Sequence, residues 1–131
     1  MATRDELIAV ANTYLQQGLL DHEPDAVLFA DDCVRIEMGV ETGGNAAQLR
    51  ELLADPAYAG NRAMHDKQWI VEDPWVHVIY DLELDKLPDP MRVSTRFRII
   101  DGRIQYLEVV FDAGALHDAI VASLEPLRTD R

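Results

Sequence analysis

The chain has 131 residues, of which 48% are hydrophobic, and 24 acidic against 12 basic side chains give it a net charge of -12. One domain accommodates this length, so we expect a single domain over residues 1–131. Because nucleic acids and anionic bilayers repel a strongly acidic surface, we expect no nucleic-acid partner and no membrane partner.

The sequence also bears on the cellular compartment. Cys33 is the only cysteine, so no intrachain disulfide can form and a reducing compartment is expected. The N-terminus lacks the basic and then apolar pattern of a secretory signal. No apolar run approaches the ~20 residues that span a bilayer. These features predict a cytoplasmic protein.

Two helices are predicted at the N-terminus. The sequence Thr3-Arg4-Asp5-Glu6 forms a capping box, after which apolar residues recur at helical spacing to about Leu20. Pro24 suits the first turn of a second, short helix that carries residues 27–29 and ends at residues 31–32.

A strand and a third helix follow. Residues 33–38 alternate in the manner of a strand, which places Glu37 on the same face as Arg35. Residues 39–44 form a turn region. Asn45, with Gln48 three positions later, then predicts the start of a third helix.

The rest of the chain is predicted to be mostly β-structure. Strands are expected at residues 63–72, 75–84, 91–100 and 103–111, followed by a short helix over 113–124 and a frayed tail. Three helices before an antiparallel meander predict an α+β fold, with the helices on the concave face of a curved sheet.

The turn at Asp101-Gly102 decides which side chains share a face. A two-residue loop pairs Ile100 with Arg103, whereas a three-residue loop with a left-handed glycine pairs Ile99 with Arg103. We prefer the second, because it keeps apolar residues on one face and opposite charges paired on the other. The apolar face then carries Met91, Val93, Thr95, Phe97, Leu107, Val109 and Phe111.

Several short motifs, taken together, resemble a known superfamily. They are Tyr14 on the first helix, the Phe29-Ala30-Asp31-Asp32 run, the acid Glu37 on a strand, and Arg96-Phe97-Arg98 before the last strand. In order and spacing they resemble the ketosteroid isomerase and SnoaL-like members of the NTF2-like superfamily. The resemblance implies a conical cavity between helices and sheet, and a homodimer.

The resemblance also implies roles for individual residues. Tyr14 matches a tyrosine that donates to a developing enolate oxygen, and Glu37 matches a proton-shuttling carboxylate, though the family has Asp there and a proline where this chain has Met38. Thr95 stands where the family has an aspartic acid that donates to the same oxygen. The expected binding residues are His65, Trp69, Tyr80, Phe97, Leu107, Val109 and Phe111.

Each of these residues also has a structural interpretation. Glu37 could pair with Arg35 on its own strand face, and Tyr14 could simply fill the helix–sheet core. His65 shares a face with Trp69 if their strand is regular, yet a lone histidine is more often a satisfied structural residue.

Other kinds of site have less support. Asp81 and Glu108 suggest a charged site like that of limonene epoxide hydrolases, but Val109 stands where that family has an aspartate. The four histidines show no metal-ligand spacing, and no glycine-rich phosphate loop is present, so neither a metal nor a cofactor is expected.

Two functions therefore remain open. The first is an enzyme that isomerises, dehydrates or cyclises an apolar ketone-bearing or polycyclic molecule by acid–base chemistry at Glu37. The second is a non-catalytic module that binds a small molecule or dimerises.

Overall fold

The structure, a computed structural model, describes residues 2–114, so most of the helix expected at 113–124 lies outside the described residues. The first predicted helix is present as α1 (Arg4–Thr13), followed directly by a π-helical segment, η1 (Tyr14–Leu20). The Thr3 hydroxyl accepts a hydrogen bond from the Glu6 amide at 3.2 Å, which confirms the predicted cap. π-Helical turns are wide and are frequent at functional sites.

The second predicted helix is wrong beyond its first turn. Only a 3-10 turn, η2 (Pro24–Ala26), forms there, and Phe29 begins the strand β1 (Phe29–Glu37) instead of ending a helix. The backbone of Leu28 accepts a hydrogen bond from Ile104 at 2.8 Å, and Phe29 pairs with the same residue. Pairing with the last strand buries Phe29, so tertiary contact overrides the local pattern.

The next segment follows the prediction more closely. Part of the expected turn region is the short strand β2 (Val40–Gly43), which precedes α2 (Ala46–Leu53). Asn45 caps α2 as predicted, since its side chain accepts from the Gln48 amide at 2.9 Å. A 3-10 turn, η3 (Pro56–Gly60), leads into the large sheet.

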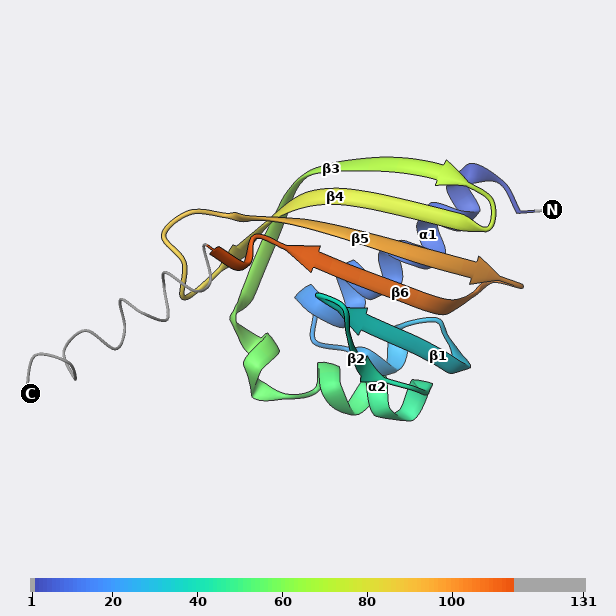
Figure 1. Cartoon of the computed structure of the whole chain (residues 1–131), viewed down its shortest axis with the longest axis horizontal. Helices are drawn as coiled ribbons and strands as arrows, with labels where there is room; N and C mark the ends of the chain where they lie inside the picture. The colour runs from blue at the N-terminus through green and yellow to red at the C-terminus, as the bar shows by residue number, and fades with distance from the viewer. Residues whose placement is uncertain (1, 115–131) are drawn as a thin grey trace, which may run out of the picture.

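Within the described residues, six strands form one sheet in the order β2-β1-β6-β5-β4-β3. The pairs are antiparallel except β1 with β6, which is parallel. Figure 1 shows α1 behind the strands and α2 below β1 and β2. The long strands match their predictions closely: β3 (Asn61–Glu72), β4 (Trp75–Leu84), β5 (Met91–Ile100) and β6 (Arg103–Phe111).

The β5–β6 turn corrects one prediction and preserves its consequence. The loop has two residues, not three: Ile100 pairs with Arg103, and both Asp101 and Gly102 have positive φ. A bulge at Gln105 then shifts the register, so that Arg96 pairs with Glu108 and Thr95 with Val109. The apolar face is therefore the predicted one.

The described fold is thus α+β, with the core between the helices and the concave face of the sheet. Buried residues from α1, η1 and α2 pack against those of β4, β5 and β6. Among the described helices, none is long and apolar enough to cross a membrane.

Candidate functional site

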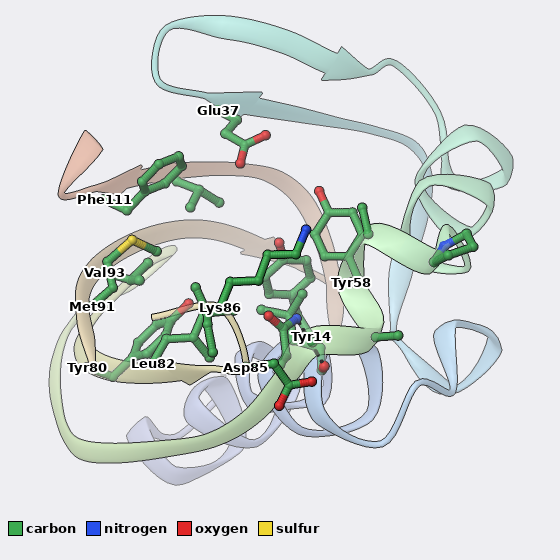
Figure 2. Close-up of a pocket in the computed structure, with 18 of the residues that line it drawn as sticks. Tyr14, Glu37, Tyr58, Tyr80, Leu82, Asp85, Lys86, Met91, Val93 and Phe111 are labelled. Carbon is green, nitrogen blue, oxygen red and sulfur yellow. Dashed lines mark hydrogen bonds between the residues drawn. The ribbon is translucent and has the colours of Figure 1, made fainter. Parts of the chain in front are cut away.

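A cavity of about 510 Å³ lies between the sheet, η1, η3 and the β4–β5 loop. Exposed residues of η3 and of that loop form its rim, whereas its deeper walls are mostly apolar. Figure 2 shows side chains from these separate elements directed toward a common centre. The apolar wall residues on the sheet are Leu82, Leu84, Met91, Val93, Val109 and Phe111.

Arg35 is the central polar residue of this cavity. It lies on the inward face of β1 and is only 2% exposed to solvent. Its Nε donates to the Tyr14 hydroxyl at 3.0 Å, and its Nη1 donates to Thr42 at 2.8 Å and to Glu37 at 3.2 Å. A buried guanidinium needs such partners, because an unpaired buried charge is costly.

Electrostatics keep Arg35 charged. Burial by itself lowers the pKa of Arg35, but the nearby Tyr14, Tyr58 and Glu37 outweigh that effect and raise it. We call Tyr14, Arg35, Glu37 and Tyr58 the polar cluster. Its members come from η1, β1 and η3, and all four line the cavity.

Glu37 lies in the cavity and in an ion pair at the same time. Its side chain is 30% exposed, and its Oε2 accepts from Arg35. Both sequence interpretations therefore describe part of what is observed: the carboxylate faces the hollow, and it is held by its neighbour two residues away.

Tyr14 is also both a core residue and a cavity residue. It is 1% exposed, and its ring packs edge-on against Phe29 and Phe97, with centroids at 6.4 Å and 5.7 Å. Nearby, the buried Asn61 amide donates to the Leu19 carbonyl at 3.2 Å. This bond satisfies a carbonyl at the end of η1, and so helps to hold the segment that carries Tyr14.

Two further phenols line the cavity. Burial raises the pKa of Tyr58, with Arg35 acting in the opposite direction. Burial, then Tyr14, raises the pKa of Tyr80, while its contact with Thr95 lowers it. The Tyr80 and Thr95 hydroxyl oxygens lie 3.4 Å apart. Both phenols are therefore neutral donors at ordinary pH.

The structure separates the predicted binding residues. Tyr80, Val109 and Phe111 line the cavity, whereas Phe97 and Leu107 are buried in the packed core beside it. Thr95 is likewise buried and reaches the cavity only through its contact with Tyr80.

His65 and Trp69 do not line this cavity, because their strand is irregular. Asp66 has a positive φ of 57°, and a bulge lies between His65 and Gln68. His65 consequently pairs with Asp81 and lies exposed against Glu83 at 3.0 Å, while Trp69 pairs with the buried Val78 and packs on the core.

Arg35 and Tyr58 are the site residues that sequence reasoning missed. The sequence indicates Arg35 only as a partner of Glu37, because arginine is rarely buried. Its place on the same face as Cys33 and Glu37 was the available signal. The sequence held no comparable signal for Tyr58, since η3 is brought to the cavity by tertiary packing.

Helices on one face of a six-stranded, mostly antiparallel sheet, as described here for residues 2–114, form a fold shared with solved structures of NTF2-like proteins. A family model described as "Domain of unknown function (DUF8021)" matches residues 1–111, and the chain belongs to that family. A search of curated proteins finds no match.

Solved structures share the fold at low sequence identity. An LEH-like epoxide hydrolase from M. tuberculosis is 20% identical, with a TM-score of 0.70 over 97% of this chain and 98% of its own. A protein assigned as a SnoaL-like polyketide cyclase from Jannaschia sp. CCS1 is 15% identical, at 0.71 over 92% and 96%. One assigned as a ketosteroid isomerase from Kribbella flavida DSM 17836 is 15% identical, at 0.70 over 82% and 78%.

These comparisons show the fold shared with ketosteroid isomerases, polyketide cyclases and epoxide hydrolases, and not the reaction. The acids considered for an epoxide hydrolase-like site lie elsewhere. Asp81 bonds Arg92 at 2.6 Å and Glu108 bonds Arg96 at 2.9 Å, and none of these four residues lines the cavity.

Proposed function

We propose that the protein binds a small, largely apolar molecule, of steroid or polyketide type, in this cavity. One observation carries the proposal: Tyr14 and Glu37 are joined through Arg35 at one part of a cavity whose other walls are mostly apolar. A volume of about 510 Å³ lies within the range of ligand pockets, which combine apolar walls with a few convergent polar groups.

A pair of tryptophan variants tests binding. Val109→Trp places an indole in the cavity, whereas Ile70→Trp adds the same bulk at an exposed position on β3. We expect progesterone binding, followed by saturation-transfer NMR, to weaken at least about tenfold in Val109→Trp and to be unchanged in Ile70→Trp. Unchanged affinity in Val109→Trp, or no binding by the wild type, would contradict a steroid-type ligand in this cavity.

A second candidate function is acid–base isomerisation, dehydration or cyclisation of the bound molecule. The convergence of Glu37 and Tyr14 favours it, with Glu37 moving the proton and Tyr14 donating to the oxyanion. Thr95 would act through Tyr80, as a positioning residue. The Arg35–Glu37 ion pair favours the alternative, a non-catalytic binding module.

Proton exchange separates the catalytic and non-catalytic alternatives. If the enzyme hypothesis holds, the protein accelerates exchange of the acidic protons of an enone steroid into deuterated water, and Glu37→Gln abolishes this while leaving the circular dichroism spectrum intact. Exchange retained in Glu37→Gln would remove Glu37 from the mechanism, and no exchange in the wild type would favour the module.

A homodimer in the cytoplasm remains part of the proposal. The contact would use the outer sheet face that carries Arg96, Tyr106 and Glu108. Light scattering that gives a monomeric mass would refute the dimer.

A further inference from the structure

We propose that the ligand carries an anionic oxygen group, a carboxylate or a stable enolate, before any reaction. Arg35 and the hydroxyl groups of Tyr14 and Tyr58 bind this anionic group. The inference rests on the proposed function, because it names the class of ligand that this cavity takes. It differs from the sequence-based expectation, in which a neutral ketone develops its charge only in the transition state.

The hydrogen bonds of the Arg35 side chain all run outward from its guanidinium. Its Nε donates to Tyr14 and its Nη1 donates to Thr42 and Glu37. None of these bonds uses Nη2, which is therefore available to Tyr58 or to a ligand. Burial raises the pKa of Tyr58 and Arg35 partly offsets that effect, as a nearby cation does. Guanidinium groups bind carboxylates and similar anions strongly because several donors lie in one plane.

The phenol groups of Tyr14 and Tyr58 supply donors to the cavity. Tyr14 accepts from Arg35 with its oxygen, so its own O–H remains a donor, and no acceptor for it is seen among the described residues. Tyr58 also lines the cavity, and Figure 2 shows its ring directed toward the centre from η3. The two phenol donors favour any oxygen that accepts hydrogen bonds, and the buried Arg35 cation behind them favours an oxygen that carries negative charge.

The charge near the cavity differs from that of the whole chain. The chain has a net charge of -12, yet the cavity lining contains the cations Arg35 and Lys86 as well as the acids Glu37 and Asp85. Asp85 is bound by Arg62 at 3.1 Å. In Figure 2 the Lys86 side chain extends between the other lining residues toward Tyr58. Because the Debye length is about 8 Å at physiological salt, the distant acidic surface is largely screened. With Asp85 paired to Arg62, the local balance is that of Arg35 and Lys86 against Glu37.

The negative charge of Glu37 disfavours an anionic ligand, so removing that charge predicts a change in affinity of known direction. Its carboxylate repels a second anion near Arg35 and occupies one of the Nη1 hydrogens. Glu37→Gln keeps the shape but removes the charge, so it must tighten the binding of an anion. The same substitution must leave a neutral ligand of equal size almost unaffected.

Matched naphthalene derivatives provide the test. Naphthoate and its neutral methyl-ketone analogue, acetylnaphthalene, share one apolar body and differ in the charge of the oxygen group. We expect naphthoate to bind the wild type at least about tenfold more tightly, as measured by isothermal titration calorimetry at neutral pH and fixed ionic strength. An acidic, fully enolised diketone on the same ring system distinguishes an enolate from a carboxylate.

Two variants complete the design. Tyr58→Phe, at a half-buried position, is expected to weaken naphthoate binding about tenfold and acetylnaphthalene binding by only about threefold, because a hydrogen bond to a charged oxygen is the stronger one. Glu37→Gln is expected to strengthen naphthoate binding several-fold, without an effect on the ketone. Thermal unfolding of each variant serves as the control for folding.

The outcomes separate this inference from the proposed function. If acetylnaphthalene binds as tightly as naphthoate, or if Glu37→Gln does not increase the preference for naphthoate, the anionic class is wrong and the apolar cavity stands. If no naphthalene derivative and no steroid binds, both the inference and the proposed function fail.

Discussion

The two faces of the sheet carry the same group of side chains in different surroundings. On the inner face Arg35 bonds Glu37 at 3.2 Å, and on the outer face Arg96 bonds Glu108 at 2.9 Å, each with a tyrosine beside the pair. The arginine side chain is 3% exposed inside and 48% exposed outside. The shorter bond is therefore the one in water, where ion pairs contribute least.

The tyrosines beside the two ion pairs, Tyr14 and Tyr106, also differ in their hydrogen bonds. Inside, the Tyr14 oxygen accepts from the arginine, so its proton remains available. Outside, the Tyr106 hydroxyl donates to Glu108 at 3.0 Å, and its proton is already used. Arg96 also lies 4.7 Å from the centroid of the Trp75 ring. Identical residue types thus form a donor site inside and a self-satisfied surface cluster outside.

The largest loss of unfolding free energy is expected when the Arg35–Glu37 ion pair on the inner face is broken. Arg35→Ala leaves Tyr14 and Glu37 without their shared donor and leaves a hole among buried residues. Breaking a buried pair from one side typically costs 3–5 kcal/mol, and because Glu37 is partly exposed we expect about 3 kcal/mol. Urea denaturation measures the loss of unfolding free energy. A loss below about 1 kcal/mol would mean that the two faces are energetically equivalent.

A smaller effect is expected from Cys33, which shares the inward face of β1. Burial, and then Asp32, raises the pKa of this thiol from 9.0 to about 12. A raised folded-state pKa gives stability that is present below the usual thiol value and is lost as the pH rises toward 12. At about pH 10 the loss is about 1.4 kcal/mol relative to neutral pH.

The variant Cys33→Ala isolates that contribution, because Tyr58 and Tyr80, whose pKa values are also raised, act in the same direction in both proteins. The difference between wild type and variant in urea denaturation should shrink between pH 7 and about pH 10. A difference that is independent of pH would show that the thiol is not held neutral by burial.

The smallest effect is expected on the outer face. Arg96→Ala removes a half-exposed ion pair and a ring contact, and we expect a loss below about 1 kcal/mol. Raising the salt concentration should reduce this loss further, whereas it should barely change that of Arg35→Ala. Equal salt dependence for both variants would contradict the predicted difference between the buried and the exposed ion pair.

Local signals in the sequence predicted much of the fold. Thr3 and Asn45 cap their helices as expected, since capping depends only on residues three positions apart. The alternating patterns and the Asp101-Gly102 turn located the long strands. Each of these signals is complete within a few residues.

The errors come from features with no local signal. The bulges at Asp66 and Gln105 use residues other than glycine, and the first of them moved His65 away from the face of Trp69. The burial of Arg35 depends on Tyr14 and Thr42, which come from other elements. The cavity could be expected from the sequence, but its donors required the assembled structure.

The parallel pairing of β1 with β6 has a consequence for folding during synthesis on the ribosome. β1 is synthesised before β3, β4 and β5, yet its partner β6 is the last strand described and lies between β1 and the rest of the sheet. Until β6 has left the ribosome, the β1–β2 pair has an unpaired strand edge on β1, and the cavity lacks the wall that β6 provides. Such late, long-range closure makes folding slow and leaves the nascent chain dependent on protection against edge-to-edge association.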